Sequence, residues 1–120
     1  MAKILVVDDS LSMQKMVSLT LKTAGHQVVE AADGNQALTI AQKEQVDLVL
    51  SDVNMPNMNG IELCKKIRQL PNYKFTPFLM LTTESAGNVK MQGKDAGATG
   101  WLVKPFNPSQ LLATVKKVLG

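Results

Sequence analysis

Five short apolar runs alternate along the chain with longer segments in which hydrophobic residues recur every three or four positions. The runs predict strands at residues 3–7, 27–31, 46–52, 76–82 and 100–104. The run that starts at residue 46 is almost wholly apolar up to Leu50, which is typical of a strand buried on both faces of a parallel sheet. The segments between the runs have the spacing of helices with one buried face.

Two of the predicted helices have informative sequences. Ser10 or Asp9 is expected to cap the helix that follows the first strand, because both residue types accept hydrogen bonds from a first turn. The fourth helix, predicted at residues 85–96, contains Gly87 and Gly93. Each glycine lowers helix stability by about 1 kcal/mol relative to alanine, so this helix is expected to be only marginally stable.

The order of the elements predicts the topology of the sheet. A strand, a helix and a further strand in succession pair in parallel through a right-handed crossover. Repeated along the chain, this unit gives an α/β fold of the flavodoxin-like (βα)5 type, a doubly wound five-stranded parallel sheet with strand order 2-1-3-4-5. The chain of 120 residues is the size of one ordinary domain, so residues 1–120 are predicted to form a single domain.

Composition narrows the class of protein. A hydrophobic fraction of 45% favours a folded globule over disorder. The chain has few aromatic residues, so we expect an aliphatic core in which Met13, Met16 and Met80 fill gaps. The net charge is +3 and the lysines are scattered, which indicates a solvated surface rather than a nucleic-acid-binding patch.

Cysteine content and the N-terminal segment indicate the compartment. Cys64 is the only cysteine, so no internal disulfide can form and a reducing compartment is expected. The first apolar run is too short for a signal peptide or a membrane span. We therefore expect a cytoplasmic protein without a membrane partner.

Polar side chains follow several of the predicted strands at their C-terminal ends. Asp8 and Asp9 follow the first strand, Asp52 ends the third, Thr82 ends the fourth and Lys104 ends the fifth. In a parallel sheet these ends lie at one edge, which is where open α/β sheets bind ligands. Taken singly, Asp9 could be a helix cap and Asp8 a turn residue, but the full set favours a common site.

Three carboxylates this close together repel one another, and a divalent cation relieves the repulsion. Oxygen ligands without histidine or cysteine suit Mg2+, which binds through a few carboxylates and a phosphoryl oxygen. The sequence therefore predicts a magnesium site that includes Asp8, Asp9 and Asp52. It contains neither a Gly-x-Gly-x-x-Gly motif after the first strand nor a P-loop, which argues against dinucleotide or nucleoside triphosphate binding.

Four motifs give the chain a family resemblance over its whole length. They are VVDDS at residues 6–10, SD at 51–52 followed by NMPNMNG at 54–60, MLTTE at 80–84 and VKPF at 103–106. In order and spacing the sequence resembles the receiver domains of two-component response regulators. Within that family it is most similar to the stand-alone chemotaxis regulators of the CheY class.

The resemblance implies that Asp52 accepts a phosphoryl group from a phosphohistidine on a partner kinase. It also implies that Mg2+ is bound by Asp9, by Asp52 and by the backbone carbonyl of Asn54, with Asp8 acting through water. Phosphoryl transfer requires mainly positioning and charge neutralisation. The protein would thus catalyse only its own phosphorylation and dephosphorylation, and would not be an enzyme with an external substrate.

Further residues have roles implied by the resemblance. Lys104 would neutralise charge on the phosphoryl oxygens, and its peptide bond to Pro105 would be cis. Thr82 would donate a hydrogen bond to the phosphoryl group. The switch would couple Thr82 to an aromatic residue on the fifth strand, which in this chain is Trp101. Asn54 and Glu84 would tune the lifetime of the phosphate.

The implied partners are a histidine kinase similar to CheA and a downstream target on the face formed by the fourth helix, fifth strand and fifth helix. That target could be the flagellar motor switch, with the protein acting as a monomer. The alternative is a phosphate sink or shuttle in another phosphorelay. An aspartate-nucleophile phosphatase is disfavoured, because such enzymes have an Asp-x-Asp motif where this chain has adjacent aspartates. A flavin carrier is disfavoured, because the carboxylates at the site would repel an anionic flavin phosphate.

Overall fold

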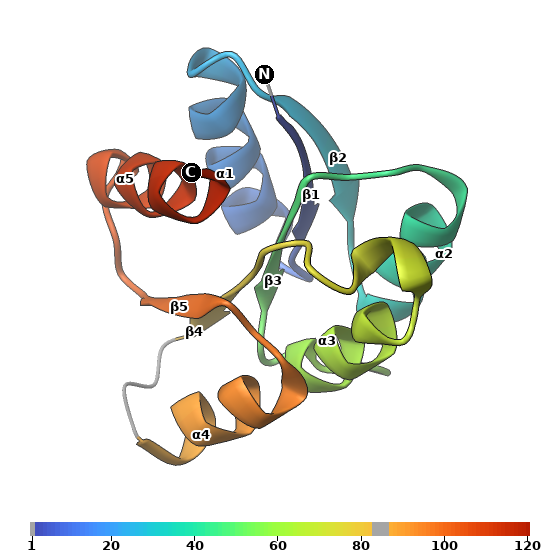
Figure 1. Cartoon of the computed structure of the whole chain (residues 1–120). Helices are drawn as coiled ribbons and strands as arrows, with labels where there is room; N and C mark the ends of the chain where they lie inside the picture. Colours follow the sequence, from blue (N-terminus) through green and yellow to red (C-terminus); the bar gives the residue numbers. More distant parts are fainter. Residues whose placement is uncertain (1, 83–86) are drawn as a thin grey trace.

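The computed structural model describes residues 2–82 and 87–120, with residues 87–91 described by their backbone alone. Strands and helices alternate through this part of the chain (Figure 1). The elements are β1 (Lys3–Val7), α1 (Leu11–Thr23), β2 (Gln27–Ala31), α2 (Gly34–Lys43), β3 (Leu48–Asp52), α3 (Gly60–Arg68), the short 3-10 helix η1 (Pro71–Tyr73), β4 (Phe78–Thr82), α4 (Gly87–Ala96), β5 (Gly100–Val103) and α5 (Pro108–Leu119).

The five strands form one parallel sheet in the order β2-β1-β3-β4-β5. This confirms the flavodoxin-like fold and strand order predicted from the sequence. Helices α1 and α5 cover one face of the sheet, while α2, α3 and α4 cover the other (Figure 1). Side chains of β1, β3 and β4 alternate between the two hydrophobic clusters, so the central strands are buried on both sides.

Several predicted boundaries differ from the observed ones. Strand β3 begins at Leu48 rather than at residue 46, because the Val46 N–H donates to the Tyr73 hydroxyl at 3.2 Å instead of to a neighbouring strand. Strand β4 begins at Phe78, after Pro77, which has no N–H to donate to a ladder. Strand β5 ends at Val103, one residue before Lys104.

Hydrophobic spacing predicted the buried face of helix α1 only in part. Ser10 is the N-cap, and its side chain accepts a hydrogen bond from the Met13 N–H. The face turned to the core consists of Gln14, Val17, Ser18 and Leu21. The prediction that Met16 fills the core is wrong, since 43% of this residue is exposed. Polar side chains occupy core positions here because each has hydrogen-bond partners.

Cys64 is fully buried on α3, and its Sγ donates to the Ala96 carbonyl at 3.4 Å. Burial raises the pKa of this thiol to about 11, against a smaller lowering by Arg68. Because the thiolate is the reactive form, we expect the native protein to resist an aromatic disulfide reagent at mildly alkaline pH. Absorbance of the released thiol would measure the rate, and a native rate equal to that of the denatured protein would contradict this expectation.

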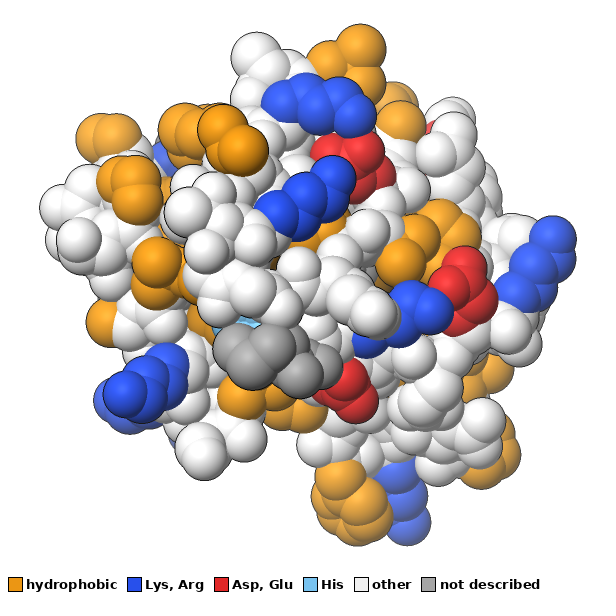
Figure 2. Space-filling view, turned by 90° about the horizontal axis from the view of Figure 1, so that it is seen from above, with side chains coloured by type: hydrophobic (Ala, Val, Ile, Leu, Met, Phe, Trp, Pro, Cys, Tyr) orange, Lys and Arg blue, Asp and Glu red, His pale blue; other side chains and the backbone are white. Residues whose placement is uncertain are grey.

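Surface charge is mixed on the face that Figure 2 displays. Lys and Arg side chains lie apart from one another there, and several sit beside Asp or Glu. Among the described residues, Lys3 pairs with Glu44, and Lys15 pairs with Glu30 at 2.8 Å. On the displayed face, basic side chains are thus interspersed with acidic ones.

Candidate functional site

Three aspartates meet where β1 and β3 end. Asp8 and Asp9 directly follow β1, Asp52 is the last residue of β3, and these two strands are neighbours in the sheet. One carboxylate oxygen from each of the three residues lies within 4.8 Å of the others. The cluster predicted from the sequence is therefore formed by adjacent strands, and its members differ in exposure: Asp8 is buried, Asp52 is half-buried and Asp9 is exposed.

Asp8 is held in place by hydrogen bonds to its backbone and to its side chain. Its backbone N–H donates to the Ala31 carbonyl at 3.1 Å, and its Oδ1 accepts from the Ser10 N–H at 2.9 Å. Its Oδ2 is buried and, among the described residues, has no hydrogen-bond donor. A buried carboxylate oxygen without a donor is unfavourable, and a cation shared with Asp9 and Asp52 would satisfy it.

Lys104, which directly follows β5, brings one positive charge to this cluster. Its Nζ lies 3.4 Å from Asp52 Oδ2 and 3.6 Å from Asp8 Oδ2. The backbone N–H of Lys104 donates to the Thr82 carbonyl at 2.7 Å, and the bond to Pro105 is cis, as the resemblance implied. One ammonium is thus shared between two carboxylates.

The pKa of Asp52 is shifted mainly by burial and then by the neighbouring charges. Burial raises the pKa of Asp52 above its ordinary value of 3.8. The Lys104 ammonium lowers the pKa, whereas the Asp8 carboxylate raises it further, and the net direction is upward. A further cation at the cluster would favour the ionised form of Asp52.

The loop after Asp52 folds back tightly on the strand. The Gly60 N–H donates to the Val53 carbonyl at 2.9 Å, and Asn57 has a positive φ of 69°. A Cβ at Gly60 would lie 2.3 Å from the Asp52 carbonyl oxygen, so only glycine fits there. Asn54, whose carbonyl and side chain have implied roles, is exposed on this loop.

Of the two residues predicted for the switch, Thr82 lies at the C-terminal edge of the sheet and Trp101 lies further back within β5. Thr82 ends β4 and is 1% exposed. Trp101 pairs with Met80 across β4 and β5, and its ring packs partly buried against the hydrophobic cluster under α2, α3 and α4. Glu84, predicted to tune phosphate lifetime, lies outside the described residues.

Sequence reasoning missed Gln14, which is buried beside the acidic cluster. Its Nε2 donates to the Asp8 carbonyl at 3.1 Å and to the Ala31 carbonyl at 2.9 Å. The signal was present in the sequence, because Gln14 lies in the first turn of α1 and helical side chains tilt toward the start of their helix, which here follows Asp8 and Asp9. Hydrophobic spacing alone did not detect it, because Gln14 is polar.

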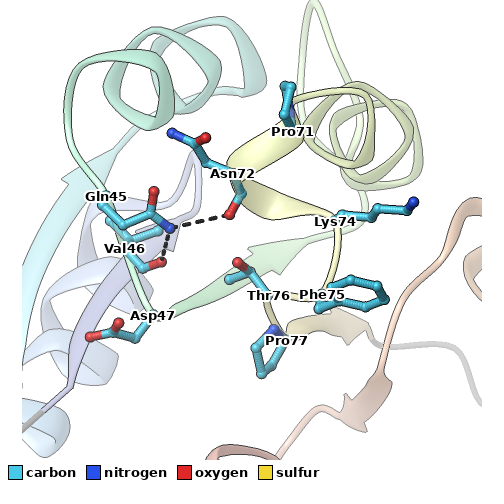
Figure 3. A pocket seen from close by; sticks show the side chains of 9 residues that line it. All are labelled: Gln45, Val46, Asp47, Pro71, Asn72, Lys74, Phe75, Thr76 and Pro77. Atoms are coloured by element: carbon cyan, nitrogen blue, oxygen red, sulfur yellow. Dashed lines mark hydrogen bonds between the residues drawn. The ribbon is translucent and has the colours of Figure 1, made fainter.

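A pocket also lies at the opposite edge of the sheet, around the residues that precede β3 and β4 (Figure 3). It is lined by Gln45, Val46, Asp47, Pro71, Asn72, Lys74, Phe75, Thr76 and Pro77. Gln45 Nε2 donates to the carbonyls of Val46 and Asn72, each at 3.4 Å, so the polar groups here connect two loops. The pocket offers no cluster of carboxylates comparable to that at Asp52.

Comparisons with known proteins identify the class. The family model for the response regulator receiver domain matches residues 4–116. A CheY homolog from Campylobacter jejuni is 41% identical over 120 residues, covering 98% of this chain and 92% of that protein. The transcriptional regulatory protein PhoP of Bacillus subtilis, which regulates alkaline phosphatase synthesis, is 40% identical over 117 residues; the match covers 98% of this chain but only 48% of PhoP.

Solved structures agree with the sequence matches. The chemotaxis response regulator CheY4 of Vibrio cholerae superposes with a TM-score of 0.96 at 58% identity, covering 98% of each chain. The receiver domain of the sensor histidine kinase PA1611 from Pseudomonas aeruginosa, with a magnesium ion in its active-site cleft, superposes with a TM-score of 0.92 at 28% identity, covering 99% of this chain and 98% of that one. The chain belongs to the receiver domains of two-component response regulators.

Membership in this family explains the acidic cluster. Receiver domains bind Mg2+ at an acidic pocket and receive their phosphoryl group from a histidine kinase, and Asp8, Asp9 and Asp52 supply such a pocket here.

Within the described residues, no helix is both long and apolar enough to cross a membrane.

Proposed function

We propose that this protein is a phosphorylation-activated switch of bacterial chemotaxis, in which Asp52 accepts a phosphoryl group from a CheA-like histidine kinase. The observation that carries the proposal is the meeting of three carboxylates within 4.8 Å, with the Lys104 ammonium 3.4 Å from the proposed acceptor. The Asp52 side chain is 13% exposed, so it is not sealed off from a donor. Its only reaction would be its own phosphorylation and dephosphorylation.

Each residue of the site would have a separate role in phosphoryl transfer. An Asp52 carboxylate oxygen forms the bond to phosphorus, while the bond from phosphorus to the donor imidazole breaks and its electron pair returns to the nitrogen. Lys104 would neutralise charge on the phosphoryl oxygens, since its Nζ lies 3.4 Å from Asp52 Oδ2, and the Thr82 hydroxyl would donate a hydrogen bond to one of these oxygens. Asp8, Asp9 and Asp52 would hold Mg2+, which would add positive charge to the site beside that of Lys104.

Chemotaxis is favoured over other pathways by similarity along the whole chain. Identity to the Vibrio cholerae regulator CheY4 is 58%, against 40% to PhoP. The face formed by α4, β5 and α5 would carry the signal to a target such as the flagellar motor switch. A phosphate sink or shuttle in another phosphorelay is the alternative role for the same chemistry.

The direct test is phosphorylation by a small donor. Incubation with Mg2+ and acetyl phosphate is expected to add one phosphoryl group, mapped to Asp52 by reductive trapping and mass spectrometry, and to change Trp101 fluorescence. Omission of Mg2+ provides the control and should prevent both changes. A wild-type protein that gains no phosphoryl group with Mg2+ present would contradict the proposal.

The downstream role needs a separate measurement. Phosphorylated and unphosphorylated protein can be compared for binding to motor-switch peptides. Binding that increases on phosphorylation would support the chemotaxis role. Absence of binding by a fully phosphorylated sample would favour the phosphate sink or shuttle.

A further inference from the structure

We propose that Gln14 is a positioning residue for the cation site. Its side-chain amide fixes the peptide group that joins Asp8 to Asp9 and thereby determines where both carboxylates lie. The inference rests on the proposed function, because it concerns the residues that would hold Mg2+. Gln14 itself does not reach the cation and acts only through the backbone of the two aspartates.

The contacts of Gln14 connect the ends of two strands. Its Nε2 donates to the Asp8 carbonyl at 3.1 Å and to the Ala31 carbonyl at 2.9 Å, so both hydrogens of the amide are used. The Ala31 carbonyl also accepts from the Asp8 N–H at 3.1 Å. Gln14 is only 4% exposed, which makes this link inaccessible to competing water. Helix α1, β1 and β2 are therefore joined at the residue that begins the acidic cluster.

Asp9 depends on this link more than Asp8 does. The Asp9 side chain is exposed, and among the described residues no hydrogen bond or ion pair holds its carboxylate. With no such contact on its side chain, Asp9 relies on its backbone position to keep its carboxylate within reach of Asp8 and Asp52, where one oxygen from each residue lies within 4.8 Å of the others. The Asp8 carbonyl belongs to the same peptide group as the Asp9 nitrogen, so a bond to that carbonyl restrains the direction in which Asp9 projects.

Filling of space does not explain an amide at this position. An apolar side chain of similar volume would pack against the same strands without the desolvation penalty of a buried amide. Ser18, one turn further along α1, is also buried, but its Oγ donates to Glu30 Oε2 at 2.7 Å, away from the acidic cluster. The two buried polar residues of α1 thus differ in whether they contact the site.

This difference gives a matched pair of variants, Gln14→Met and Ser18→Ala. Gln14→Met removes two buried hydrogen bonds of α1 and Ser18→Ala removes one partly buried bond, so both are expected to lower the free energy of unfolding. Only Gln14→Met should weaken Mg2+ binding, by about tenfold, as is typical when a group that orients metal ligands is lost. Isothermal titration calorimetry of the unphosphorylated protein measures the affinity, with denaturant unfolding on the same samples.

The outcomes are distinguishable. Equal Mg2+ affinity of wild type and Gln14→Met, or equal weakening by both variants, would overturn the inference and leave the proposed function intact. A wild-type protein that binds no Mg2+ would overturn both. If Gln14→Met does not fold, wild-type NMR decides: the Gln14 side-chain NH2 signals should exchange slowly and shift on Mg2+ addition, unlike those of exposed Gln42. Gln14 signals that exchange as fast as those of Gln42 and ignore Mg2+ would overturn the inference.

Discussion

Asp52→Asn is expected to abolish phosphoryl uptake completely and, without Mg2+, to make the folded protein more stable at neutral pH. The amide has no ionised oxygen to attack phosphorus, so activity should fall to background. Stability should rise because burial, together with the Asp8 carboxylate, disfavours the charged form of Asp52 in the folded state. The neutral amide would leave the Lys104 ammonium to Asp8 alone.

The stability difference should depend on pH in a defined direction. The pKa of Asp52 is raised in the folded state, so the wild type has its full stability where this carboxyl is protonated in both states, below 3.8. That contribution is lost as pH rises from 3.8 through the raised folded pKa, because the unfolded chain then releases its proton more readily. The advantage of Asp52→Asn should therefore be small in acid, grow across this window and then level off.

Urea unfolding of the metal-free proteins across this pH range measures the effect, and mass spectrometry after treatment with acetyl phosphate measures phosphorylation. Asp47→Asn is the matched control, since Asp47 is exposed at the opposite edge of the sheet and accepts a hydrogen bond from the Lys3 N–H. It should retain phosphorylation and gain no stability. A phosphorylated Asp52→Asn protein would show that the acceptor lies elsewhere.

Gly60→Ala and Gly93→Ala are expected to change stability in opposite directions. A Cβ at Gly60 would lie 2.3 Å from the Asp52 carbonyl oxygen and 3.1 Å from the Val53 Cα, both backbone atoms that cannot move without displacing the end of β3. We expect Gly60→Ala to lose stability toward the upper end of roughly 1–3 kcal/mol, and to weaken phosphorylation because Asp52 is displaced with its strand.

At Gly93 the same change meets only an ordinary contact. The nearest atom to a Cβ there would be Met80 Sδ at 3.5 Å, and the residue lies within α4. Gly93→Ala should therefore gain about 1 kcal/mol from helix propensity. Urea midpoints of the two variants and the wild type make the comparison. Equal effects at the two glycines would show that the loop after Asp52 relaxes freely.

The sequence was sufficient for the fold and for the centre of the site, because both follow from strict geometric rules. Alternation of strands and helices allows essentially one handedness and places every strand's C-terminal end at one edge. Asp8, Asp52 and Lys104 could thus be assigned to one cluster before any distance was known. Motif similarity supplied the cis bond between Lys104 and Pro105, which residue spacing alone does not predict.

The parts that escaped prediction depend on individual side-chain partners. Helix α1 appeared to bury Met16, yet it buries Gln14 and Ser18, since backbone carbonyls and Glu30 satisfy these polar groups. Strand β3 appeared longer than it is, because Val46 is buried without joining the ladder. Hydrophobic spacing predicts burial only for apolar residues. It does not detect a core position occupied by a polar residue whose hydrogen bonds are satisfied.

Because two carboxylates share Lys104, the binding of a cation and the binding of a phosphoryl group at this site should influence each other. Among the described residues, three carboxylates and the Lys104 ammonium form this cluster, so carboxylates outnumber ammonium groups there before any ligand binds. A phosphoryl group on Asp52 increases that excess, and a site that holds a cation more tightly after phosphorylation must, by thermodynamic reciprocity, favour phosphorylation more strongly at higher cation concentration. The free magnesium level would then set the fraction of protein in the active state at a fixed donor supply.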